Sequence, residues 1–135
     1  MGVIRPVGLI TGDYFREEEC MAFFTRVRFG HLGVSMRGLP VVVPVLYVVD
    51  ETGFLIGLSP DDVANAMTRN VIALQADGWD DDTARRWTTL AVGIPTRAII
   101  QDVDPLRTKI ERPAPWDEPH VFRLRPHVLS GRWIT

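Results

Sequence analysis

The longest apolar stretch of the chain runs from Leu39 to Val49 and contains no charged residue. Six of its eleven residues are valine, whose β-branched side chain suits a pleated strand. Because the stretch does not alternate between apolar and polar residues, we expect both faces of this strand to be covered. A barrel interior can cover one face, and a helix, a ligand or a second subunit must then cover the other. Pro44 cannot donate to a sheet ladder, so we expect it at an edge, at a bulge or beside something other than a strand. Two interpretations stay open: a core strand with an edge proline, or a strand at a dimer seam beside a ligand cleft.

Two segments carry the signals of helices. Residues 17–27 place apolar side chains on one stripe with acidic residues in the first turn, the stripe being Cys20, Phe23, Phe24 and Val27. Residues 59–62 read Ser-Pro-Asp-Asp, in which serine can cap a helix, proline fits its first position and the aspartates favour its positive end. This second helix should continue to about Arg69. A third short helix is expected over residues 104–111.

Extended segments account for most of the remaining chain. We expect extended segments over 29–36, 39–49, 54–58, 71–76, 86–100 (bent at Gly93 and Pro95), 120–124 and 128–134, which gives about six strands, mostly linked by short turns. Tight turns are predicted at 37–38 and 50–53, a solvated acidic loop at 77–82, a corner at Pro126, and a loose arm over residues 1–12. The pattern predicts one mainly β domain over residues 1–135, an antiparallel barrel with short helices.

Composition limits the classes of function. A length of 135 residues fits one core, and a net charge of −2 argues against nucleic acid as a partner. No apolar run is long enough to span a membrane and no secretory signal is visible, so we expect a cytoplasmic protein without a membrane partner. Cys20 is the only cysteine, so no intramolecular disulfide can form, and its apolar neighbours indicate a small core residue. The three histidines (His31, His120 and His127) are too scattered to suggest a metal site or a catalytic triad.

Several short stretches follow one another in a characteristic order. They are 28–34 (RFGHLGV), 38–45 (GLPVVVPV), the turn 50–53, 86–93 (RWTTLAVG), Trp116, 122–126 (FRLRP) and 130–132 (SGR). In this order the chain resembles the pyridoxamine 5′-phosphate oxidase-like, flavin-binding split-barrel proteins, especially their small actinobacterial members. The resemblance covers nearly the whole chain. Each stretch alone is short and hydrophobic, so the specific signal is their shared order.

The resemblance implies a six-stranded antiparallel Greek-key split β-barrel that forms a twofold homodimer. It also implies two cofactor clefts at the dimer seam, holding FMN or, in some members, the deazaflavin coenzyme F420. The flavin would exchange a hydride with a small-molecule substrate, and no catalytic side chain is required. A second hypothesis is a barrel that kept its dimer but lost the cofactor, and now serves as a binding or structural module.

The resemblance assigns cofactor contacts to three places in this chain. The central strand contributes Val43, Pro44 and Val45, and the turn before the second helix contributes Ser59. The later strand contributes Arg86, Trp87 and Thr88, in which a tryptophan can stack on a ring and a threonine can hydrogen-bond a ring edge. The competing interpretation of the last group is a half-buried strand tryptophan beside a solvated arginine.

One departure from the family pattern concerns the cofactor phosphate. FMN-binding members have a basic residue near the end of the third strand and another at the start of the following helix. Here these places read Gly57-Leu58 and Ser59 to Asp62, with Asp61 and Asp62 where a dianion would lie. Losing two charge-assisted hydrogen bonds lowers affinity by roughly two to four orders of magnitude. We therefore expect a weakened phosphate site or a substitute cation, for which Arg69, Arg85 and Arg86 are candidates.

Overall fold

The computed structural model describes residues 14–58, 61–99, 101 and 121–134. The elements in chain order are α1 (Glu17–Phe24), β1 (Phe29–Met36), β2 (Leu39–Asp50), β3 (Gly53–Gly57), α2 (Asp61–Met67), β4 (Ile72–Asp80), β5 (Arg85–Gly93), β6 (Thr96–Arg97), β7 (Val121–Leu124) and β8 (Val128–Ile134). The predictions for the arm 1–12, Ser59, the helix 104–111, Trp116 and His120 lie outside the described residues.

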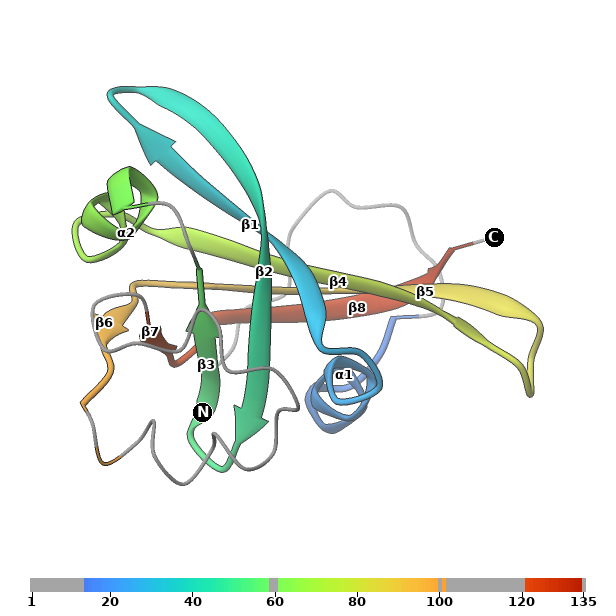
Figure 1. Ribbon diagram of the computed structural model, residues 1–135. Helices are drawn as coiled ribbons and strands as arrows, with labels where there is room; N and C mark the ends of the chain where they lie inside the picture. The colour runs from blue at the N-terminus through green and yellow to red at the C-terminus, as the bar shows by residue number, and fades with distance from the viewer. Residues whose placement is uncertain (1–13, 59–60, 100, 102–120, 135) are drawn as a thin grey trace.

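Eight antiparallel strands form one sheet in the order β6-β7-β3-β2-β1-β4-β5-β8 (Figure 1). β7 and β8 follow each other in the chain but stand near opposite ends of this order, and only residues 125–127 connect them. Such a connection spans at most ~14 Å, so the sheet must curl until its two ends lie close together. The His127 amide donates to the Val92 carbonyl at 2.7 Å and fixes this corner beside Pro126. The fold class predicted from the sequence, a mainly β antiparallel split barrel with short helices, is thereby confirmed, with eight strands in place of the six expected.

The strand boundaries follow the predicted ones with two differences. The predicted strand 86–100 is divided into β5 and the two-residue β6 on either side of residues 94 and 95. The predicted acidic loop 77–82 is wrong in its first half, because Asp77 to Asp80 continue β4. The Asp80 side chain is only 8% exposed and accepts hydrogen bonds from Thr83, at 2.6 Å from the hydroxyl, and from Arg26 at 2.7 Å. These bonds, that of Thr83 first, hold the pKa of the Asp80 carboxyl below its ordinary value.

The core lies inside the curled sheet and is closed on one side by α1. The predicted stripe is confirmed for Cys20, Phe23 and Phe24, which are all buried, but α1 ends at Phe24 rather than at residue 27, so Val27 lies beyond the helix and is half-buried. Phe23 packs against Trp87 of β5 and Trp133 of β8, with ring centroids 5.1 and 5.4 Å apart. The Tyr47 hydroxyl donates to the Phe24 carbonyl at 2.6 Å and so fixes the end of α1 to β2. None of the helices among the described residues is long and apolar enough to cross a membrane.

β2 is covered on both faces only in its second half. Val45 and Tyr47 point inward and are 3% and 2% exposed. In the first half, by contrast, Leu39 and Val42 are 67% and 66% exposed. The expectation that both faces are covered is therefore not met within one protomer, because the β1–β2 hairpin extends beyond the barrel (Figure 1).

A largely buried ion pair joins the β2–β3 turn to β7. Arg123 donates to both carboxylate oxygens of Asp50, at 3.0 and 2.8 Å, and also to the Thr52 hydroxyl. The Arg123 side chain is 9% exposed and that of Asp50 24%. Partial burial raises the pKa of Asp50, but the hydrogen bonds from Arg123 and Thr52 outweigh it, and the pKa lies below its ordinary value.

A glycine on β4 makes room for the largest core side chain. A Cβ at Gly78 would lie 2.5 Å from Cε2 and 2.8 Å from Nε1 of Trp87, whose ring is rigid and 1% exposed. A Cβ at Gly33 on β1 would meet its nearest atom, the Ala73 Cβ, at 3.9 Å, which is ordinary contact.

We predict that Gly78→Ala lowers the free energy of unfolding by about 1–3 kcal/mol. Gly33→Ala is the matched control and should change it by less than about 0.5 kcal/mol. Urea denaturation of the two variants decides this, and equal stabilities would contradict the packing argument.

The Asp50–Arg123 pair should make stability depend on acid. Because the pKa of Asp50 is lower in the folded chain than in the unfolded one, its contribution is present above about pH 4 and is lost as the pH falls through the folded value. We predict that Arg123→Met costs about 2 kcal/mol at pH 7, since it leaves a partly buried carboxylate without its cation. The difference from wild type should shrink at pH 3. Denaturation at both pH values measures it, and an equal difference at both would show that Arg123 acts only through packing.

Candidate functional site

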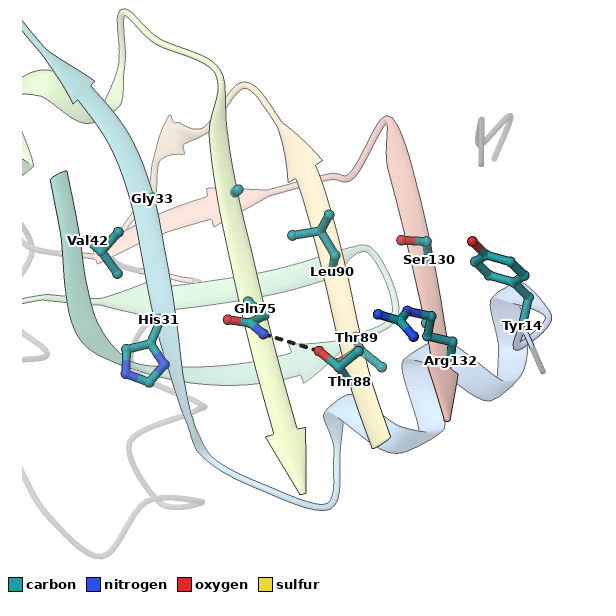
Figure 2. A pocket seen from close by; sticks show the side chains of 12 residues that line it. Tyr14, His31, Gly33, Val42, Gln75, Thr88, Thr89, Leu90, Ser130 and Arg132 are labelled. Carbon is teal, nitrogen blue, oxygen red and sulfur yellow. Dashed lines mark hydrogen bonds between the residues drawn. The ribbon is translucent and has the colours of Figure 1, made fainter. Parts of the chain in front are cut away.

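A cavity of about 360 Å³ lies on the outer face of the sheet, opposite the core (Figure 2). Its lining comes from β1, β2, β4, β5 and β8 and from the residue that bridges to β8: His31, Gly33, Val42, Ala73, Gln75, Thr88, Thr89, Leu90, Ser130, Gly131, Arg132 and Tyr14. Side chains from five neighbouring strands meet on this outer face, among them Val42, Thr88 and Arg132, whereas Thr89, next to Thr88 on the alternating strand, is buried on the core side.

Strand register arranges these residues in rows across the sheet. Gly33 of β1 stands between Val42 of β2 and Ala73 of β4. Two adjacent positions in this row therefore carry no side chain or only a methyl group, which leaves a low, flat and apolar floor. The next row has His31 opposite Gln75.

A hydrogen-bond network fixes the polar part of the cavity. The Gln75 amide nitrogen donates to Asp77 at 2.8 Å and to the Thr88 hydroxyl at 3.2 Å, and that hydroxyl donates to Asp77 at 3.0 Å. These bonds assign the orientation of the Gln75 amide. Figure 2 shows its nitrogen turned toward Thr88 on β5 and its oxygen turned toward the side of His31 on β1. Both N–H bonds of the amide and the Thr88 O–H are used within this network, so the Gln75 oxygen is left to accept from a donor on a ligand.

Positive charge stands at the β8 side of the cavity. Arg132 lies opposite Thr88 in the β5–β8 ladder, and its backbone pairs with that of Tyr14. The cavity thus combines a flat apolar floor, a fixed amide and hydroxyl, and a guanidinium. This combination suits a flat heteroaromatic ring with polar edges.

Of the predicted contacts on β5, only Thr88 lines the cavity. Trp87 is on the opposite face, in the core, so the expectation that its indole lines the cleft is not met within the protomer. Adjacent residues of a strand point to opposite faces, which prevents Trp87 and Thr88 from sharing one site. Arg86 is exposed outside the lining, with its guanidinium carbon 5.9 Å from the centre of the Trp79 ring. That Arg86 contacts a cofactor stays a prediction.

The predicted contacts on β2 are divided between the two faces. Val45 is in the core, and Val43 is half-buried against it. Pro44 is exposed on the outer face, opposite His31, beside the cavity but not part of its lining. Ser59 lies outside the described residues, so its role stays a prediction.

Eleven of the twelve lining residues were not among the predicted contacts, and four of them set the shape and polarity of the cavity: Gly33, Ala73, Gln75 and Arg132. One signal was available for β4. In the strand predicted at 71–76, Gln75 is the only polar residue, and Ala73 shares its face because alternate residues of a strand point the same way. The pairing that brings Gln75 to Thr88 joins residues thirteen positions apart, which the sequence pattern does not specify.

Comparison with known proteins agrees with this architecture. A sequence profile of the family described as pyridoxamine 5′-phosphate oxidase matches residues 16–133. No curated protein matches the chain significantly.

Several solved structures share the fold. The FAD binding protein from Mycobacterium smegmatis superimposes with a TM-score of 0.72 at 19% identity, over 92% of this chain and 98% of that chain. A FAD-binding protein from Mesorhizobium loti gives 0.69 at 20% identity, over 90% and 97%. The flavocytochrome Anf3 from Azotobacter vinelandii gives 0.69 at 16% identity, over 90% and 69%. At these identities the likeness shows the fold.

Proposed function

The chain belongs to the pyridoxamine 5′-phosphate oxidase family, and from this premise we propose that it is a flavin-binding oxidoreductase whose outer cavity holds the flavin ring. The single observation that carries the proposal is the flat floor at Gly33 and Ala73 beside the ordered Gln75–Thr88 pair. Three structural neighbours with the same fold are named for a flavin, which supports the same cofactor class here.

The residues present fit a flavin ring. An isoalloxazine ring is flat and largely apolar, so it can lie over the small side chains of the floor, flanked by Val42 and Leu90. Its pyrimidine edge carries acceptors and one N–H donor. Both N–H bonds of the Gln75 amide and the O–H of Thr88 are used within the network with Asp77, so the Gln75 oxygen is the group that can accept from the N–H of this edge. We propose FMN as the flavin. The deazaflavin F420 has a similar ring and is the alternative.

A bound flavin supplies hydride transfer to or from a small-molecule substrate. The part of the protein is to place the ring and to limit water around it. Gln75 and Thr88 orient one ring edge, because their mutual hydrogen bond reduces their own freedom before the ligand arrives. Arg132 contributes a positive charge that favours electron-rich or anionic groups at the β8 side.

We also propose that the cavity is completed in a twofold homodimer. The outer face of the β1–β2 hairpin leaves two apolar side chains exposed. Val42, in the lining of the cavity, is 66% exposed, and Phe29, outside the lining, is 65% exposed. Exposed apolar side chains gathered on one face are characteristic of an interface. A second copy seated there would cover both the side chains and the open side of the cavity. We expect a stable dimer burying about 1,600 Å² or more.

Filling the floor of the cavity should abolish flavin binding without unfolding the protein. We predict that Ala73→Leu weakens FMN binding at least tenfold, because the larger side chain stands where the ring would lie. Ala22→Leu, on the exposed face of α1, is the matched control and should bind as wild type does. Quenching of flavin fluorescence measures affinity, and thermal denaturation checks the fold. A wild-type protein that binds neither FMN nor F420 would instead favour the cofactor-free module.

A charge on the exposed half of β2 should separate the dimer. We predict that Val42→Asp yields a monomer at micromolar concentration with an unchanged circular dichroism spectrum, because Val42 contributes little to the core of its own protomer. Ile99→Asp is the control, since Ile99 is 56% exposed beside a different cavity, that of Asp50 and Arg123. Sedimentation velocity distinguishes the species. A wild-type protein that sediments as a monomer would refute the dimer.

A further inference from the structure

A second cavity, of about 560 Å³, lies between the tip of the β1–β2 hairpin and the end of α2. We propose that it binds the phosphate or pyrophosphate group of the flavin nucleotide, with Arg37 and Arg69 as the cations. This inference rests on the proposed function, because the flavin ring in the first cavity is what brings the anion here.

The charges in this second cavity favour an anion. Its polar lining residues are Ser35, Arg37, Asn65, Arg69 and Asn70, and none of the described residues that line it is acidic. Neither Arg37 nor Arg69 takes part in an ion pair found among the described residues. Guanidinium groups together with amide and hydroxyl donors are typical of phosphate recognition. The cavity beside Arg123 differs, because Asp50 and Glu51 stand among its arginines.

Local structure holds both arginines at this place. Arg37 and Gly38 have φ angles of 54° and 79°, the left-handed values of the two central residues in a tight hairpin turn. This turn sets Arg37 at the tip of the hairpin, which Figure 1 shows above α2. On the other side, the Asn70 side chain and the Arg69 amide both donate to the Ala66 carbonyl, at 2.8 and 3.4 Å. They satisfy a carbonyl at the end of α2 that would otherwise repel an anion.

The linings of the two cavities come close to each other on β1. Gly33 lines the first cavity and Ser35 the second. Residues two apart point to the same face and lie ~6.6 Å apart along a strand. Ser35 is exposed and Gly33 has no side chain. A further two residues lead to Arg37. The ribityl chain that separates a flavin ring from its phosphate has a length of the same order as the distance between Gly33 and Ser35.

This placement accounts for the missing phosphate turn. The family pattern puts cations at the start of the helix that follows the third strand, where this chain has Asp61 and Asp62. Arg69 comes just after the end of the same helix. The anion site would thus have moved from the start of α2 to its far end, where the β1–β2 turn adds Arg37.

The test compares FMN with riboflavin, which differ only by the phosphate. Arg37→Asn removes the charge and keeps a residue that tolerates a positive φ, and Arg69→Gln removes the other charge. We expect wild type to bind FMN at least tenfold more tightly than riboflavin. The double variant should lose that preference, a change of about 1.4 kcal/mol in FMN binding, with riboflavin affinity unchanged. Arg125→Gln, an exposed arginine at the other cavity, is the matched control and should keep the preference.

Inorganic pyrophosphate provides a second readout. It should compete with FMN for wild type but not for the double variant, and it should leave riboflavin binding alone. A wild type that binds both flavins equally would overturn the inference and leave the proposed function standing. So would a double variant that still prefers FMN. A wild type that binds neither FMN, riboflavin nor F420 would instead overturn the proposed function itself, and the inference with it.

Discussion

The pleat of β5 is the constraint on which both faces of this molecule depend. Trp87 fills the core against Phe23, and Gly78 on the paired strand leaves the room that its rigid ring needs. A shift of one residue would turn every side chain of the strand to the opposite face, so the buried indole fixes the register of β4 and β5. That register sets Gln75 and Thr88 together on the outer face. The packing of the core therefore determines the geometry of the cavity behind it.

Much of the fold could be predicted because it depends on local patterns. The strand 29–36, the turn at residues 37–38 and the stripe of α1 follow from residue spacing and turn chemistry, and the order of short stretches indicated the family. Features set by distant partners could not be predicted. Asp80 is buried because Arg26, fifty-four positions earlier, reaches its carboxylate. Alternation along the strand could have predicted that Trp87 and Thr88 lie on opposite faces. Which of the two residues points into the core is decided by α1.

The exposed apolar side chains and the first cavity lie on the same face of this molecule, and this arrangement affects how tightly a cofactor could be held. A cavity open on one side exposes a bound ring to water, and water weakens every polar contact inside it. The same face presents Phe29 and Val42 to solvent. Burying those side chains against a second copy would stabilise the assembly through the hydrophobic effect and would also exclude water from the cavity. Association and cofactor binding would then favour each other, because each removes water from the same surface.

The charges around α2 suit the helix itself and are the reverse of what a phosphate at its start would need. The sequence places acidic residues at the first positions of α2 and Arg69 just after its end, the order of charges that a helix dipole favours. A helix arranged in this way gains stability but repels an anion from its amino end. Under the proposal made above, the nucleotide phosphate is bound elsewhere. The β1–β2 turn is suited to this because its left-handed residues are fixed by the hairpin, and an arginine there adds charge without altering a packed element.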